Sequence, residues 1–158
     1  MASVAEKLQK DYAEDWNNVS GCFPRLPCTC LTSPPTARYN CIAWAADQTD
    51  VWWWPSSFPQ PGCYWPPNAP RNNSLTSFLS AYGTLGYVPI GAGDIDNYQR
   101  VIAITGQDGK VLHAMKRLPD GRWSSKLGKS FDIVHGLNEL DGNTYGTVIG
   151  FMGKELKK

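Results

Sequence analysis

Apolar residues recur four positions apart near the N-terminus, with charged residues between them. This spacing predicts that residues 1–19 form an amphipathic helix whose apolar face packs on the rest of the domain. Ser3 and Glu6 form a capping box at the start of this helix. The apolar positions are Val4, Leu8, Tyr12 and Trp16.

Prolines interrupt the next part of the chain, so residues 20–38 are expected to run extended over the surface. Residues 39–86 are expected to hold a short helix, an aromatic loop and a second helix. Asn40 caps the first helix at Cys41, and Ser74 caps the second helix. Both helices carry apolar residues that a sheet can cover.

The second half of the chain has the apolar patterns of strands, which predict an antiparallel sheet over residues 87–153. Asp120 and Gly121 predict a tight hairpin turn within it. The whole pattern predicts a single α+β domain over residues 1–158, with N-terminal helices packed on a C-terminal antiparallel sheet. Strands are expected at residues 87–90, 100–105, 111–118, 122–127 and 145–152, and a short helix or turn at 131–137.

The composition is that of a globular protein, with 42% hydrophobic residues, 18% charged residues and a formal net charge of +1. With so little net charge, we expect no nucleic-acid partner and no attraction to an acidic membrane. No apolar run approaches the roughly 20 residues of a membrane span. The first residues do not resemble a signal peptide, so cytoplasmic synthesis is expected, with export by a leaderless route left open. We expect a monomer.

Cys41 is the first candidate for chemistry, because Asn40 puts it in the first turn of the predicted helix. Free backbone N–H groups and the helix dipole favour a thiolate there and lower the pKa of the thiol. A cysteine nucleophile is commonly activated in this way. The alternative is a small buried hydrophobic side chain, since free cysteine is among the most buried residue types.

The chain holds seven tryptophans, and several of them lie in a proline-rich loop after the Cys41 helix. They either cover the core like a lid or line a substrate groove beside Cys41. Stacked tryptophans suit a sugar ring or an extended peptide. The candidates for substrate binding are Asn40, Trp44, Trp53, Trp54 and Trp65.

The five cysteines are an odd number and argue against a complete disulfide framework. A structural zinc site on Cys22, Cys28, Cys30 and Cys63 is a weaker hypothesis, because their spacing matches neither a zinc ribbon nor a zinc finger. We expect no metal and no cofactor at the candidate site.

His113, on a predicted central strand, is the candidate partner of Cys41. A cysteine at a helix start packed against a strand histidine is the general arrangement of papain-like cysteine enzymes. There the histidine takes the thiol proton and later protonates a leaving amine. The backbone N–H of Cys41 is expected to stabilise an oxyanion. Without the cysteine, a strand histidine is an ordinary core or surface residue.

This order of a helix cysteine and a sheet histidine resembles the compact papain-like superfamily of NlpC-type peptidases, CHAP amidases and transglutaminase-like enzymes. Residues 106–114 resemble the NlpC hairpin, but Arg100 stands where that alignment has its general-base histidine, and His113 falls on its third, orienting position. In the transglutaminase-like alignment His113 is the base, and Lys126 and Leu127 stand where an aspartate is expected.

Longer motifs resemble a bacterial domain family of unknown function across nearly the whole chain. This resemblance implies that functional residues lie among these motifs and carries no established activity. The motifs include Tyr39-Asn40-Cys41-Ile42-Ala43-Trp44-Ala45, Trp52-Trp53-Trp54-Pro55, His113-Ala114 and Leu118-Pro119-Asp120-Gly121-Arg122-Trp123-Ser124-Ser125-Lys126-Leu127-Gly128.

A third residue should orient His113, and the sequence leaves its identity open. In a tight hairpin Ser124 shares the face of His113, whereas a turn one residue longer brings Ser125 to that face. Asp132 is the nearest downstream carboxylate, and its alternative role is a helix cap. The candidates for catalysis are thus Cys41, His113, Ser125 and Asp132.

The first hypothesis is therefore a papain-like thiol hydrolase or transferase acting on an amide bond, as a peptidase, amidase or deamidase. Its substrate would be a peptide, a protein or a peptidoglycan-type molecule. The second hypothesis is a non-catalytic binding module that holds a peptide or glycan with the tryptophan-rich loop. Replacing Cys41 separates the two, because only the first needs the thiol.

Overall fold

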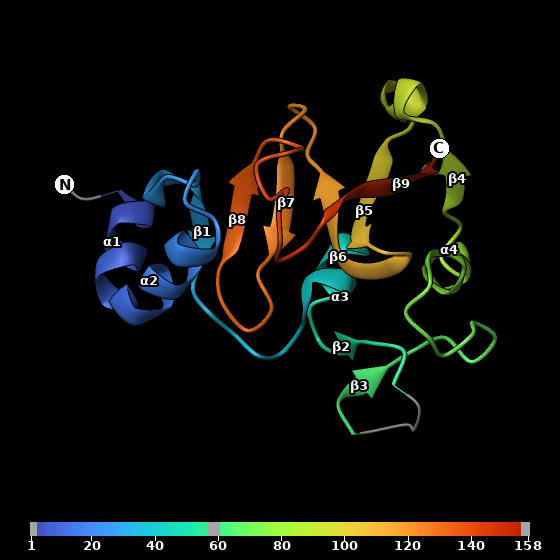
Figure 1. Cartoon of the computed structure of the whole chain (residues 1–158), viewed down its shortest axis with the longest axis horizontal. Helices are drawn as coiled ribbons and strands as arrows, with labels where there is room; N and C mark the ends of the chain where they lie inside the picture. The colour runs from blue at the N-terminus through green and yellow to red at the C-terminus, as the bar shows by residue number, and fades with distance from the viewer. Residues whose placement is uncertain (1–2, 57–60, 156–158) are drawn as a thin grey trace.

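A seven-stranded antiparallel sheet runs through the protein in the computed structural model (Figure 1). The structure describes residues 3–56 and 61–155, apart from the side chain of Cys28. The strand order is β1-β8-β7-β6-β5-β9-β4. The strands are β1 (Leu31–Ser33), β4 (Val88–Ile90), β5 (Arg100–Gln107), β6 (Lys110–Arg117), β7 (Trp123–Lys126), β8 (Asp132–His135) and β9 (Thr147–Lys154).

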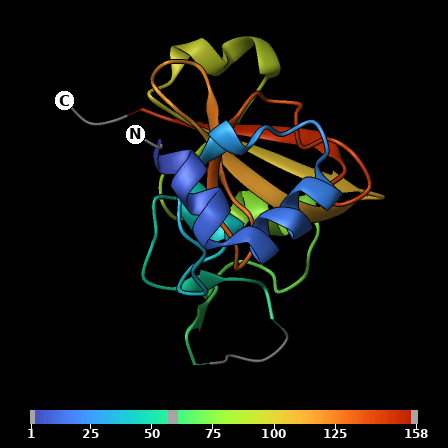
Figure 2. The ribbon, with the colours of Figure 1, turned by 90° about the vertical axis from the view of Figure 1, so that its left-hand side faces the viewer.

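Helices flank this sheet. α1 (Val4–Asp11) and α2 (Ala13–Cys22) lie beside the end that carries β1 and β8, and Figure 2 shows them in front of the strands. α3 (Cys41–Ala45) and α4 (Leu75–Gly83) contact the central strands. The remaining elements are the 3₁₀ helices η1 (Cys28–Cys30) and η2 (Ala92–Asn97) and a parallel pair of strands, β2 (Trp52–Trp53) and β3 (Cys63–Tyr64).

Successive residues of the central strands face different cores, as the alternation of a strand requires. Ala114 of β6 packs with α3 and with Phe78 and other buried residues of α4. Met115, the next residue, packs on the opposite face with Trp123 of β7. A further cluster joins α1 and α2 to the β1–β8 end of the sheet, where Ile133 is fully buried.

Capping side chains confirm three predicted helix starts. Ser3, Asn40 and Ser74 each accept a hydrogen bond from the backbone N–H three residues later, at 3.1, 3.2 and 3.3 Å. The strand predicted at residues 87–90 is also confirmed: it is β4, which pairs with β9 at one end of the sheet.

Three local predictions were wrong. The helix over residues 1–19 is interrupted at Tyr12, whose φ of −126° and ψ of 49° are not helical. The segment 20–38 does not run only over the surface, because it contains β1, where Leu31 is buried, and residues 131–137 contain β8 instead of a helix or turn. Both strands are short and pair with each other, so their stability comes from a partner distant in sequence. Asp132 is therefore a strand residue and not a helix cap.

Candidate functional site

Cys41 stands at the first position of α3, where Asn40 anchors the turn. The Asn40 side chain accepts the N–H of Ala43 at 3.2 Å and the N–H of Trp53 at 3.0 Å, and it donates to the Trp53 carbonyl at 2.7 Å. Asn40 is buried, which shields these bonds from water. The tryptophan-rich loop is thereby tied to the start of the Cys41 helix.

A cavity of about 330 Å³ opens beside Cys41. Within the described chain, β6 pairs with β7 at Lys116 and Arg117, and the cavity lies past the end of this pairing, where the two strands diverge. Its volume is in the range of pockets that hold small ligands, which begins at roughly 300 Å³. The lining residues are Asn40, Cys41, Trp52, Trp54, Leu112, Gly128 and Tyr145.

Burial raises the pKa of Cys41 to about 11. Backbone N–H groups, that of Ala114 foremost, and the positive charge of Lys126 oppose this shift. Desolvation dominates because the thiol is buried and α3 has only five residues to supply a helix dipole. The low thiol pKa expected from the helix start is thus wrong, and Cys41 is a neutral thiol near pH 7.

His113 lies on β6 with one ring nitrogen hydrogen-bonded and the other free. Its Nε2 is 3.0 Å from Oγ of Ser125 on β7. Its Nδ1 is buried and has no hydrogen-bond partner among the described residues. The ring lies flat against the ring of Tyr145, with 4.0 Å between centroids and 9° between planes. Ser125, and not Ser124, is therefore the serine that contacts His113.

Ser125 links His113 to a second histidine. The Oγ of Ser125 is 2.6 Å from Nε2 of His135 on β8, and Nδ1 of His135 is 2.6 Å from the Gly136 carbonyl oxygen. Burial lowers the pKa of His113 to about 3 and also lowers the pKa of His135. Both rings are therefore neutral near pH 7. We call His113, Ser125, His135 and the Gly136 carbonyl the histidine relay.

Cys41 and His113 lie on opposite sides of β6. Ala114 belongs to the core that contains Cys41, so the side chain of His113 points to the other face, where it meets Ser125. Tyr145 reaches both residues, because it stacks on His113 and lines the cavity with Cys41. Among the described residues, no hydrogen bond joins Cys41 to His113.

Asp132 bonds with Tyr39 in the described chain and not with His113. Its Oδ2 accepts the Tyr39 hydroxyl at 2.8 Å, and its Cα pairs in register with that of Lys126. The Lys126 ammonium donates to the carbonyl oxygens of Thr36, at 2.7 Å, and Gly128. Burial raises the pKa of Asp132 and lowers the pKa of Lys126 to about 8. We call Tyr39, Lys126 and Asp132 the charged cluster.

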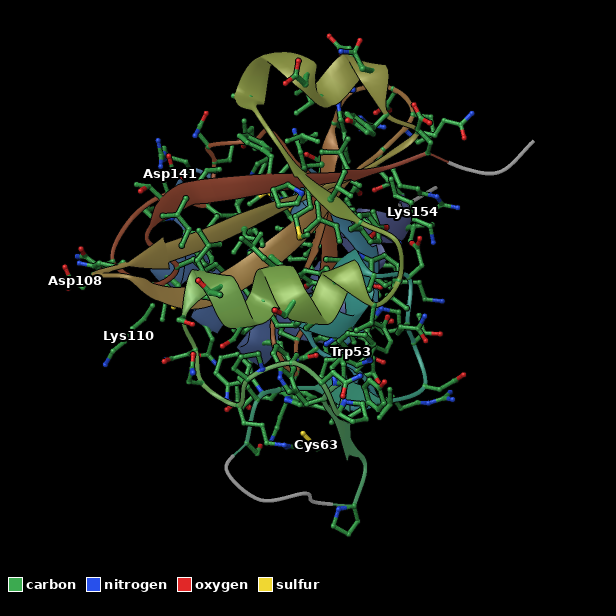
Figure 3. All side chains as sticks on the ribbon, turned by 90° about the vertical axis from the view of Figure 1, so that its right-hand side faces the viewer. Trp53, Cys63, Asp108, Lys110, Asp141 and Lys154 are labelled. Atoms are coloured by element: carbon green, nitrogen blue, oxygen red, sulfur yellow. The ribbon has the colours of Figure 1, made fainter. Side chains whose placement is uncertain are left out.

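The predicted tryptophans divide between the core and the cavity. Trp53 and Trp65 are 4% and 3% exposed and belong to the core beneath α4; Figure 3 labels Trp53 there. Trp44 donates to Ser124 at 3.0 Å and does not line the cavity beside Cys41. Trp54 lines that cavity, as does Trp52.

The described residues contain no group of three or more His, Cys, Asp or Glu side chains that could hold a metal ion. Cys22 is exposed at the end of α2. Cys63 lies on β3, beyond Trp53 and away from α4 in Figure 3. The side chain of Cys28, the second member of the suggested zinc set, lies outside the described residues.

Three residues of the site were given no role from sequence: His135, Tyr145 and Trp52. The four residues from Asp132 to His135 do not alternate between polar and apolar, so they carry only a weak strand signal for His135. Trp52 belongs to a loop that the sequence marks as aromatic. For Tyr145 no local signal exists, because its stacking on His113 depends on contacts between distant segments.

The chain belongs to the family described as "Domain of unknown function (DUF7689)", which matches residues 30–153. The matched range includes the cavity, the histidine relay and the charged cluster, whereas α1 and α2 precede it. No curated protein and no solved structure matches the chain. In the described part of the chain, no helix has the length and apolar character needed to cross a membrane.

Proposed function

We propose that this protein is a papain-like thiol enzyme that acts on an amide bond, with Cys41 as nucleophile and His113 as general base. The observation that carries this proposal is the state of His113: Nε2 is held by Ser125, while Nδ1 is buried and no described residue pairs with it. An unpaired buried nitrogen costs free energy, so its retention favours a functional role. Cys41 supplies a thiol in the adjoining cavity.

In the proposed reaction Cys41 attacks the carbonyl carbon of a bound amide while its proton passes to Nδ1 of His113. The carbon–nitrogen bond then breaks, and His113 returns the proton to the leaving nitrogen. Water, or an acceptor amine, attacks the resulting thioester and frees the thiol. Because both groups start neutral, the proton moves during the attack and not before it.

Because the two residues lie on opposite sides of β6 and His113 is held by Ser125 and Tyr145, this mechanism requires the Cys41 sulfur to move to within hydrogen-bond distance of Nδ1 of His113 when substrate binds. Catalytic hydrogen bonds are often long in ligand-free enzymes and shorten in the substrate complex. Tyr145 supports such an approach, because it contacts the His113 ring on one side and the cavity on the other.

The experiment is a peptide-cleavage and ammonia-release assay with a mixture of peptides that includes glutamine side chains and peptidoglycan stem peptides. Cys41→Ala and His113→Ala are each expected to reduce turnover to background while the circular-dichroism spectrum stays native. Cys22→Ala is the matched control, because Cys22 is an exposed cysteine outside the cavity, and it should keep full turnover. Full turnover by Cys41→Ala would refute the proposal.

The second candidate function is a binding module, and the neutral thiol with no hydrogen bond to His113 favours it. Trp52 and Trp54 would then hold the ligand in the cavity. A soluble peptidoglycan fragment, a disaccharide with a stem peptide, serves as the probe. Under this function Trp54→Ala weakens binding about tenfold or more, a loss of roughly 1–3 kcal/mol, while Cys41→Ala binds as the wild type does. Unchanged binding by Trp54→Ala would exclude the module.

A further inference from the structure

The histidine relay ends on a group that accepts hydrogen bonds and cannot donate them. Nδ1 of His135 lies 2.6 Å from the carbonyl oxygen of Gly136. Because a carbonyl oxygen has no proton to give, Nδ1 of His135 must carry the proton of this bond. In a neutral imidazole the other nitrogen is then an acceptor, so Nε2 of His135 is bare.

The direction of every other bond in the relay follows from this end. The Ser125 hydroxyl lies 2.6 Å from the bare Nε2 of His135, so Ser125 donates to His135. The same oxygen has given away its only proton and can only accept from His113, 3.0 Å away. His113 therefore carries its proton on Nε2, and its Nδ1 has a free lone pair.

We propose that Ser125 and His135 are positioning residues that hold His113 in the Nε2–H tautomer and so keep Nδ1 free to accept a proton. The use of that nitrogen for the Cys41 proton rests on the proposed function; the tautomer itself does not. The relay thus does with two neutral side chains what a carboxylate does in other base-orienting arrangements.

The opposite direction of the relay is unfavourable. It would need a second proton on His135, which puts a charge in a buried site, and it would give His113 a buried Nδ1–H with no partner. The carboxylate of Glu139, which accepts the backbone N–H of Gly136, favours such a proton, but burial of His135 outweighs it and lowers the pKa of that ring. Arg122 lines a cavity with His135, but its guanidinium pairs with Asp120.

The stacked ring of Tyr145 completes the arrangement. Its face lies 4.0 Å from the face of His113, so it fixes the plane of the imidazole without offering a hydrogen bond to either nitrogen. Rotation of His113 that would exchange its two nitrogens is therefore hindered from one side. Ser125 and Tyr145 together hold both the orientation and the tautomer.

The test is ¹⁵N NMR of the full chain labelled at histidine, at pH 7, with His113 assigned by comparison with His113→Gln. The wild type should show His113 with a protonated Nε2 and an unprotonated Nδ1, since the two states differ widely in nitrogen shift. Ser125→Ala should lose this single-tautomer signature and show averaged shifts. Ser125→Thr, which keeps the hydroxyl, should restore it.

Ser124→Ala is the matched control, because Ser124 is the neighbouring buried serine and bonds with Trp44 on the other face. It should leave the nitrogen shifts of His113 unchanged. A wild-type spectrum with the proton on Nδ1 would overturn the proposal without any variant, as would a Ser125→Ala spectrum identical to wild type. The peptide-cleavage assay of Cys41→Ala tests the proposed function only. Its result does not change the conclusion about the His113 tautomer.

Discussion

Ser125 and Lys126 are neighbours on β7, and they join two buried polar groups of opposite character on the two faces of the sheet. Ser125 belongs to the histidine relay, whose members are neutral and linked by directional hydrogen bonds. Lys126 belongs to the charged cluster, where an ammonium and a carboxyl group lie beside a tyrosine hydroxyl. The two histidines, Ser125, Lys126 and Asp132 are all buried, so water is largely excluded from their polar atoms.

The difference shows what each arrangement is suited to do. The neutral relay leaves one nitrogen unpaired and orients it, which suits a base. The charged cluster leads back to the segment before α3, because Lys126 bonds the Thr36 carbonyl and Asp132 bonds the Tyr39 hydroxyl. It therefore holds the approach to Cys41 against the sheet and acts as a structural clamp.

The largest effect is expected from acid, which disrupts the neutral histidine relay. Folding lowers the pKa of His113 from 6.5 to about 3, so the unfolded chain binds a proton first as pH falls. Stability that is fully present above about pH 6.5 is lost as pH falls toward 3, by on the order of 4 kcal/mol. Urea unfolding at a series of pH values measures the slope of unfolding free energy against pH. A His113→Phe variant should start less stable and lose much of the slope; an unchanged slope would contradict the assignment.

The next effect breaks the charged cluster. Lys126→Met removes the donor to two carbonyls and leaves Asp132 without its neighbouring positive charge. We expect the free energy of unfolding to fall by on the order of 3 kcal/mol, because buried groups are left unpaired. In the Lys126→Met protein, Asp132→Asn should lower the free energy of unfolding by less than it does in the wild type, since the two residues are coupled. Additive losses in urea unfolding would show that the residues do not form one cluster.

A smaller effect is expected from Tyr39→Phe, which changes one hydrogen bond of the charged cluster. Tyr39→Phe removes the hydroxyl that donates to Asp132 at 2.8 Å but keeps the ring that stacks on Trp44 at 5.5 Å. We expect a loss of about 1 kcal/mol in unfolding free energy. The pKa of Asp132 should also rise further, because the Tyr39 bond lowers it. NMR titration of the Asp132 carboxyl carbon checks this, and an unchanged pKa would remove Tyr39 from the cluster.

Features that depend on neighbouring residues were predictable from sequence. The caps at Ser3, Asn40 and Ser74 were, because a short polar side chain three residues before a free N–H is a local signal. The same reasoning put Cys41 at the start of α3. It failed for the pKa of that thiol, because burial is decided by packing from distant segments.

Which serine contacts His113 depends on the register of the hairpin, and a shift of one residue changes the answer. The backbone N–H of Leu118 bonds the Arg122 carbonyl at 2.7 Å, so three residues form the loop and not the two of a tight turn. Lys116 then pairs with Ser124, and Ser125 shares the face of His113. A slip of one residue exchanges the faces of a strand, which is why the sequence left both serines open.

Pairing between distant strands could not be predicted from local patterns. The histidine relay draws on three strands, and the loop after β8 supplies its terminal carbonyl. Since β8 is stabilised by pairing on both sides, its four residues carry too weak a signal by themselves. Ser125, the partner of His113, was among the sequence candidates. The role of His135 became visible only in the folded structure.

The proposed role of His113 as the base for Cys41 is tested most directly by the rate of Cys41 alkylation by iodoacetamide at pH 7. Peptide mass mapping gives the rate for each cysteine, and exposed Cys22 serves as an internal reference. General-base catalysis predicts that His113→Ala slows alkylation of Cys41 by about 100-fold and leaves that of Cys22 unchanged. An equal rate for Cys41 in both proteins would show that the thiol does not use His113.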